Sequence, residues 1–175
     1  MSTLKTNNVQ VGQSVTATNN FTLYQPSTPD GTVRLGVGNT GATTADVASF
    51  NSSGVFAFNS GYGSSATAYG CRAWVNFNGT GTVAISASGN VSSITDNGTG
   101  DYTVNFATAL ADASYSTTIT SSADSSNIRA IIATIGQTTS YTYQAPTTTT
   151  VRFDLRYGAG NDLYDCQNVN VAVFR

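Results

Sequence analysis

The segment from Cys71 to Phe106 constrains the fold most strongly, because it alternates apolar and polar residues in short runs separated by glycine-rich turns. Alternation with a period of two places one set of side chains on each face of a β-strand. The pattern predicts four strands, over residues 73–77, 82–87, 91–95 and 101–106. Two of the connections contain Asn-Gly, which supplies the positive backbone dihedral angles of tight hairpin turns. We therefore expect consecutive antiparallel strands here.

Similar alternation recurs on both sides of this segment. Upstream it predicts strands over residues 21–24, 32–37, 47–50 and 55–58, with a loop at 38–46. Downstream it predicts strands over residues 115–120, 128–135, 139–144, 151–157 and 169–174. In the strand at 151–157 we expect an apolar inward set and a charged outward set: Val151, Phe153, Leu155 and Tyr157 against Arg152, Asp154 and Arg156. Every Ile lies at or after Ile85, which places the deeper core in the C-terminal region.

The composition agrees with a chain made of strands. Charged residues make up 9% of the 175 residues, far below the roughly 25% of typical soluble domains. Helix-favouring Glu, Lys and Leu are absent or scarce, whereas strand-favouring Thr, Val, Tyr and Phe are common. We therefore predict an all-β fold with an extended N-terminal β arm at residues 1–65, a linker at 66–70 and an antiparallel β-sandwich at 71–175.

The N-terminal arm is expected to depend on other chains. Residues 1–65 contain 16 Val, Leu, Phe or Tyr residues but no uninterrupted apolar run. The region also lacks a disulfide and a metal site, which are the usual reinforcements of small folds. We therefore expect it to be held within an oligomer or a larger assembly.

Several classes of partner and location are disfavoured. A net charge of −2 provides no attraction for nucleic acids or anionic lipids. The opening residues lack a basic segment followed by an apolar run, so we expect no secretory signal. No stretch approaches the 18 or more apolar residues of a membrane-spanning helix, so no membrane insertion is expected.

The sequence offers little for catalysis. The chain has no His, which removes the common nucleophile–base arrangements. Two carboxylates can cleave glycosides, and the candidate pairs are Asp96 with Asp101 and Asp162 with Asp165. The segment 96–101 also has a weak likeness to a calcium loop, but it lacks the full ligand register and the final Glu. Because Asp is favoured in turns, we interpret all four as structural and expect no enzyme activity, cofactor or metal.

The two cysteines, Cys71 and Cys166, allow two interpretations. They are either two separate reduced thiols or one disulfide that joins the start of the compact region to its last strand. The spacing does not decide between them, although the missing secretory signal favours thiols.

A few residues are candidates for contacts with a partner, because aromatic residues and Arg are favoured at binding hot spots and sugars stack on aromatic rings. The candidates are Arg72, Trp74, Arg156, Tyr157, Asp162 and Tyr164. The structural alternative is that Trp74 packs in a core or between subunits and that Arg72 pairs with an Asp.

The segment from Ala73 to Phe106, AWVNFNGTGTVAI followed by SGNVSSITDNGTGDYTVNF, resembles a module of tail fibres and related appendage proteins of tailed bacteriophages, many of them marine or cyanobacterial. The opening MSTLK is similar to the start of such proteins. The resemblance implies a non-enzymatic virion structural protein that forms a homotrimer and attaches to the tail or baseplate through its N-terminal arm. It also implies a distal C-terminal domain that contacts a host surface glycan or protein.

On this interpretation the protein is made in the host cytoplasm and becomes part of the virion as a tail appendage. Two alternatives stay open. The chain could be a capsid decoration protein or tail adaptor with no receptor role, or it could be a carbohydrate-binding β-sandwich module.

Overall fold

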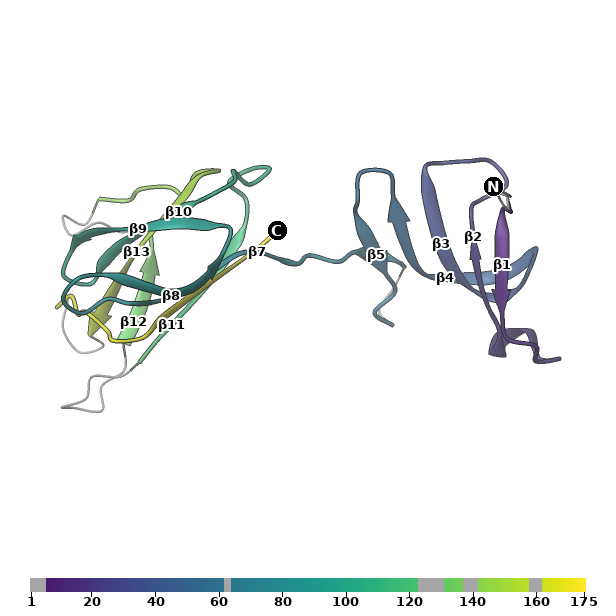
Figure 1. Ribbon diagram of the computed structural model, residues 1–175, viewed down its shortest axis with the longest axis horizontal. Helices are drawn as coiled ribbons and strands as arrows, with labels where there is room; N and C mark the ends of the chain where they lie inside the picture. Colours follow the sequence, from purple (N-terminus) through teal and green to yellow (C-terminus); the bar gives the residue numbers. More distant parts are fainter. Residues whose placement is uncertain (1–5, 62–63, 123–130, 137–141, 158–161) are drawn as a thin grey trace, which may run out of the picture. The chain divides into compact units, whose positions relative to one another are not determined.

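The computed structural model describes residues 6–61, 64–122, 131–136, 142–157 and 162–175. These residues form fourteen strands and one short 3-10 helix, η1 (Ala17–Asn19), and they contain no α-helix. All pairings between strands are antiparallel, so the all-β prediction is confirmed. The chain divides into two compact units, Met1–Ala68 and Tyr69–Arg175 (Figure 1).

The N-terminal unit is a six-stranded sheet in which each strand pairs with the next along the chain. Its strands are β1 (Asn8–Val11), β2 (Phe21–Tyr24), β3 (Thr32–Asn39), β4 (Ala42–Asn51), β5 (Phe56–Phe58) and β6 (Ala66–Thr67). The loop predicted at 38–46 is wrong, because β3 and β4 extend through it and only Thr40 and Gly41 separate them. Gly41 has a φ of +78°, which permits this tight reversal.

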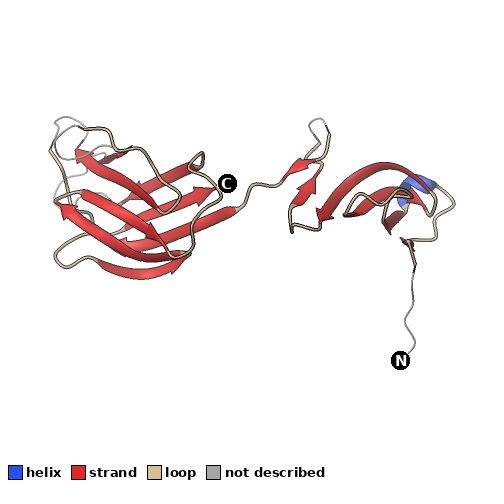
Figure 2. Cartoon of the chain, turned by 90° about the horizontal axis from the view of Figure 1, so that it is seen from above, coloured by secondary structure: helices blue, strands red, loops and turns tan. Residues whose placement is uncertain are grey.

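The C-terminal unit is a sandwich of two four-stranded sheets, and strand is the dominant structure of both units (Figure 2). One sheet has the order β11-β14-β7-β8 and the other has the order β12-β13-β10-β9. The strands are β7 (Cys71–Asn78), β8 (Ala84–Gly89), β9 (Val91–Gly98), β10 (Asp101–Phe106), β11 (Ser116–Ser121), β12 (Ile131–Ile135), β13 (Thr150–Tyr157) and β14 (Val169–Phe174). β10 and β14 begin and end where the sequence predicts.

The core of the sandwich lies between these two sheets. The ring of Phe77 on β7 meets the ring of Tyr102 on β10 edge to face, with 5.1 Å between centroids. Val151, Phe153 and Leu155 are fully buried, as their alternation predicts. All buried apolar side chains that the structure describes lie between Ala73 and Val173, which confirms that the deeper core is C-terminal.

Two predicted strands extend beyond what the structure describes. β12 begins at Ile131, and residues 128–130 of the predicted strand at 128–135 lie outside the described residues. Of the strand predicted at 139–144, only residues 142–144 are described, and they belong to none of the fourteen strands.

Candidate functional site

The outer face of the sheet β11-β14-β7-β8 presents the chain's only Trp. Ala73, Val75 and Phe77 point into the core, so alternation turns Trp74 and Asn76 outward. We call this surface the Trp74 face. Its members are Trp74 and Asn76 of β7, Ala87 and Gly89 of β8, Ser116, Thr118 and Thr120 of β11, and Asn170, Ala172 and Phe174 of β14.

Trp74 lies against a glycine and is open to solvent. It pairs across the sheet with Gly89 on one side and Ala172 on the other. A Cβ atom at Gly89 would be 2.4 Å from the indole Nε1, so only glycine leaves room for the ring in this position. The residue keeps 44% of its surface exposed. A flat aromatic surface is therefore held on the sheet by two small neighbours.

Amide groups extend this face along the strand direction. The Asn76 Nδ2 group donates to the Oδ1 atoms of Asn168 and Asn170, the latter at 2.6 Å. The amide donors of Asn168 and Asn170 have no hydrogen-bond partner within the described parts of the chain, and both residues are exposed. They therefore offer Nδ2 donors on the same face of the sheet as the indole, next to the exposed Thr120 of β11.

Arg72 adds a single positive charge at the beginning of β7. It is exposed, and it takes part in none of the ion pairs that the structure describes. Trp74 likewise lies outside the core. The described residues therefore contain no ion pair between Arg72 and an Asp, and Trp74 does not pack in the sandwich core.

The other four interaction candidates belong to the opposite sheet and its neighbouring segment. Tyr157 donates its backbone N–H to the Asp162 carbonyl at 3.0 Å, and Tyr164 donates to the Leu155 carbonyl at 3.0 Å. Tyr157 and Tyr164 are half-buried, and Asp162 is exposed. The six candidates thus do not form one site, because only Arg72 and Trp74 share a surface.

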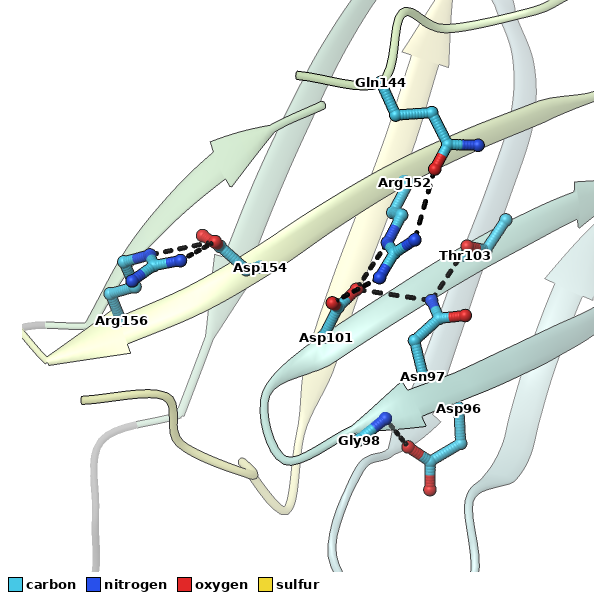
Figure 3. A network of polar contacts seen from close by, with 9 residues as sticks. All are labelled: Asp96, Asn97, Gly98, Asp101, Thr103, Gln144, Arg152, Asp154 and Arg156. Atoms are coloured by element: carbon cyan, nitrogen blue, oxygen red, sulfur yellow. Dashed lines mark hydrogen bonds and ion pairs between the residues drawn. The ribbon is translucent and has the colours of Figure 1, made fainter. Parts of the chain in front are cut away.

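Arg156 is a correction, because it was predicted to face outward as a contact residue. Its side chain is only 10% exposed, and its Nε and Nη2 atoms donate to Asp154 Oδ2 at 2.8 and 2.6 Å (Figure 3). Leu163 pairs with Arg156 through an isolated antiparallel β-bridge. Asp154 is fully buried, and its Oδ1 atom has no partner within the described structure.

A second buried ion pair lies on the same sheet. Arg152 Nε and Nη2 donate to the two carboxylate oxygens of Asp101, at 2.8 and 2.6 Å. Asn97 donates to the same carboxylate at 3.2 Å, and Gln144 accepts from Arg152 Nη1 at 3.2 Å (Figure 3). The hydrogen bonds to Asp101 raise the pKa of Arg152. The geometry is that of a structural clamp between β10 and β13.

Each candidate pair of catalytic carboxylates contains a member with a structural role. Asp101 is fully buried against Arg152, while Asp96 accepts from the Gly98 N–H at 2.9 Å and shapes the turn. Asp165 accepts from the Gly100 N–H at 2.6 Å and from the Tyr102 hydroxyl at 2.5 Å. Burial raises the pKa of Tyr102, with a further contribution from Asp165, so the phenol remains a hydrogen-bond donor.

The described residues contain no group of three or more His, Cys, Asp or Glu side chains placed to hold a metal ion. Both cysteines are thiols, Cys71 exposed and Cys166 buried, so the structure does not contain the disulfide that the sequence left open. No helix in the described part of the chain is long and apolar enough to cross a membrane.

The N-terminal sheet carries a second candidate surface, which the sequence did not reveal. Cross-strand pairing places Val9 beside Leu23, Leu23 beside Leu35, and Val33 beside Phe50. We call this surface the N-terminal apolar face. Its members are Val9, Val11, Phe21, Leu23, Val33, Leu35, Val37, Ala48, Phe50, Phe56 and Phe58.

No described segment of the N-terminal unit covers this face. Val11 is 64% exposed and Phe50 is 53% exposed. The only side chains that are buried in the described part of the unit are polar, those of Asn20 and Thr22. The Phe50 and Phe56 rings stack on each other with 4.8 Å between centroids, and Val9, Leu23, Val33 and Phe50 help to line an open hollow of about 710 Å³.

Among the described residues of this unit, the charged side chains of Arg34 and Asp46 lie on the opposite side of the sheet. Arg34 forms ion pairs with Asp30 and with Asp46, the latter at 2.9 Å. The position after Arg34 is Leu35, which points to the apolar face by alternation. The face becomes apparent only when the strands are paired in the correct register, because its members come from strands that are far apart in sequence.

Comparison of the chain with protein-family models, with curated proteins and with solved structures found no match.

Proposed function

We propose that the chain is a non-enzymatic structural protein of a phage tail appendage that assembles through its N-terminal unit and uses its sandwich in adsorption to the host. The observation that carries the proposal is the uncovered N-terminal apolar face. A sheet with one apolar face is stable in water when another layer covers that face. The resemblance of the segment from Ala73 to Phe106 to tail-fibre modules supports the virion setting.

The size of the face fits a protein interface. Its eight most exposed members are Val9, Val11, Phe21, Leu23, Val33, Phe50, Phe56 and Phe58. Together they leave on the order of 650 Å² in water, at roughly 150–200 Å² for each fully exposed residue. A standard interface buries about 800 Å² on each partner. Exposed apolar patches of this size mark interaction sites.

Other copies of the same chain are the occupants that we propose. The apolar face carries no charged side chain among the residues of its strands that the structure describes, so identical faces meet without repulsion. Each copy has the same exposed apolar area, and packing the copies against one another removes this area from water in every copy. The resemblance to tail fibres favours three copies, with the tail or baseplate bound by the assembled N-terminal units.

The test is the mass of the full chain in solution. Light scattering coupled to size exclusion should give three times the 18.1 kDa of one chain. Phe50→Asp places a carboxylate on the face and removes roughly 2–3 kcal/mol of apolar burial per copy, enough to weaken association more than tenfold. Far-UV circular dichroism establishes that the variant folds.

The matched control is Ser49→Asp. Ser49 precedes Phe50 on β4, points to the other face and pairs across the sheet with Arg34. The same charge is therefore added one residue away, and the mass should stay that of the assembly. A folded monomer of the unaltered chain at tens of micromolar would refute the proposal, as would a Phe50→Asp variant with unchanged mass.

A tail adaptor or decoration protein is the second candidate function. It needs the same apolar face for assembly but has no use for an exposed Trp beside amide donors. Ligand binding at the Trp74 face therefore separates the two functions.

A further inference from the structure

We infer that the Trp74 face binds a neutral glycan built of hexose or N-acetylhexosamine units. The inference rests on the proposed function only in that adsorption gives such a site its purpose. It is carried by the exposed indole, by the amide donors on the same sheet face and by the near absence of charge.

The indole has the position that stacking on a sugar ring requires. Gly89 lies beneath Nε1, and Trp74 keeps nearly half of its surface in solvent. The C–H face of a pyranose ring is apolar and matches the flat face of an aromatic ring, whose electron-rich surface attracts such hydrogens. Ala172, the neighbour of Trp74 on β14, also has a small side chain.

The polar groups around Trp74 match the hydroxyl groups of a sugar. Asn76 is two residues from Trp74 on β7, about 7 Å along the strand, on the same face. Asn170 lies directly across from Asn76, and its Nδ2 donor is open to solvent. Thr120 follows across from Asn170 on β11. Amides and hydroxyls both donate and accept, as sugar hydroxyls do.

A protein partner fits this face less well than a glycan. Its large apolar side chains are Trp74, 44% exposed, Phe174, 39% exposed, and at its edge Ile85 of β8, 38% exposed. Their exposed surface is a small fraction of the roughly 800 Å² that each partner buries in a stable protein interface. Open amide donors would also be left without partners under an apolar surface, which is unfavourable. A hydroxyl-rich, uncharged ligand satisfies them.

The position of Arg72 decides between a neutral and an acidic glycan. It lies two residues before Trp74, at the end of the face away from Asn76. The amide cluster, by contrast, extends from Trp74 toward Asn168 and Asn170. The groups that would surround a stacked ring on the amide side are uncharged, and we therefore assign a neutral ligand.

The single Trp gives the site its own optical probe. We suggest titrating the full chain with hexamers of β-1,4-linked glucose, mannose, galactose and N-acetylglucosamine and following Trp emission, with calorimetry in parallel. At least one hexamer should shift the emission and saturate. Trp74→Ala should raise the calorimetric Kd at least tenfold, and Asn76→Ala should raise it severalfold.

Two variants serve as controls. Tyr143→Ala removes another exposed aromatic residue, 70% exposed, which lies near Gly136 at the end of β12 in the other sheet. Arg72→Gln removes the neighbouring charge. Both should bind the neutral hexamer with an unchanged Kd. Gly89→Ala should weaken binding and alter the emission of the free chain, because its Cβ displaces the indole.

The inference is overturned if none of the four hexamers binds, or if Trp74→Ala binds as well as the unaltered chain. Binding restricted to acidic glycans and lost in Arg72→Gln would also overturn the neutral assignment. The outcomes are separable from those of the proposed function. If the chain assembles but binds none of the glycans, only the glycan site is refuted. If the chain is a monomer that binds a glycan through Trp74, the glycan site is supported and the proposed assembly is refuted.

Discussion

Removal of the Arg152 guanidinium should weaken the sandwich strongly. Arg152 bonds both oxygens of Asp101, whose side chain is fully buried, while its own side chain is 19% exposed. Across the ladder between β10 and β13, Asp101 stands directly opposite Asp154, which is also fully buried. Two buried carboxylates therefore lie opposite each other on neighbouring strands, and each forms an ion pair with an arginine.

The substitution Arg152→Met keeps most of the aliphatic length and deletes the charge. Asp101 would then lose both of its hydrogen bonds to Arg152 and keep the one from the amide of Asn97, at 3.2 Å, among its hydrogen bonds. Breaking one side of a buried ion pair costs about 3–5 kcal/mol, because the other charge stays buried without compensation. Arg152 has some exposure to water, so we place the loss at about 3 kcal/mol, a large part of the 5–15 kcal/mol that stabilises a typical domain.

Urea unfolding of the full chain, followed by Trp emission, measures this loss for the sandwich alone. Trp74 is the only Trp and lies in the C-terminal unit. At a slope of roughly 1.5–2 kcal/mol per molar urea, the midpoint should fall by about 1.5–2 M. Arg72→Met is the matched control, since Arg72 is exposed and belongs to none of the described ion pairs, and its midpoint should hardly move. Equal midpoints for the two variants would show that the clamp contributes little.

Two further outcomes follow from the structure. A thiol reagent should modify one group in the native chain, Cys71, and a second, the buried Cys166, only after unfolding; two reactive thiols in the native chain would contradict this burial. Hydrogen bonds from Thr32 lower the pKa of Asp30 from 3.8 to about 2, so this carboxylate stabilises the fold above pH 4 and the contribution disappears between pH 4 and 2. Thermal unfolding followed by circular dichroism should show a lower midpoint at pH 2 than at pH 4. The fall should be smaller in the Asp30→Asn variant.

Strict alternation allowed the core strands to be predicted from the sequence. The residues 151–157 show why: Val151, Phe153 and Leu155 are separated by charged residues, and each is fully buried. Where the alternation is interrupted, the prediction failed. The pairing of β3 with β4 has register shifts between Leu35 and Gly36 and between Val37 and Gly38. These irregularities interrupt the alternation, so the sequence predicted a loop where the two strands are in fact paired.

The surfaces were less predictable than the strands, because they depend on residues that are distant in sequence. The exposure of Trp74 is set by Gly89, which is brought beside it by the pairing of β7 with β8. Arg156 was predicted to be an exposed contact residue, but its side chain is buried and pairs with Asp154. Alternation tells which face a side chain takes, and only the fold tells whether that face is covered.

The scarcity of charge becomes more pronounced once the structure is considered. The sequence has seven basic residues, and four arginines among them form ion pairs with aspartates: Arg34, Arg152, Arg156 and Arg175. The pairs of Arg152 and Arg156 are largely buried, so these charges hold strands together and do not project toward partners. The two candidate surfaces among the described residues are an apolar sheet face in one unit and an amide- and hydroxyl-rich face in the other. Because neither depends on charge attraction, salt has little to screen at either one. The assembly and the glycan recognition that we propose would therefore depend on apolar area, stacking and hydrogen bonds.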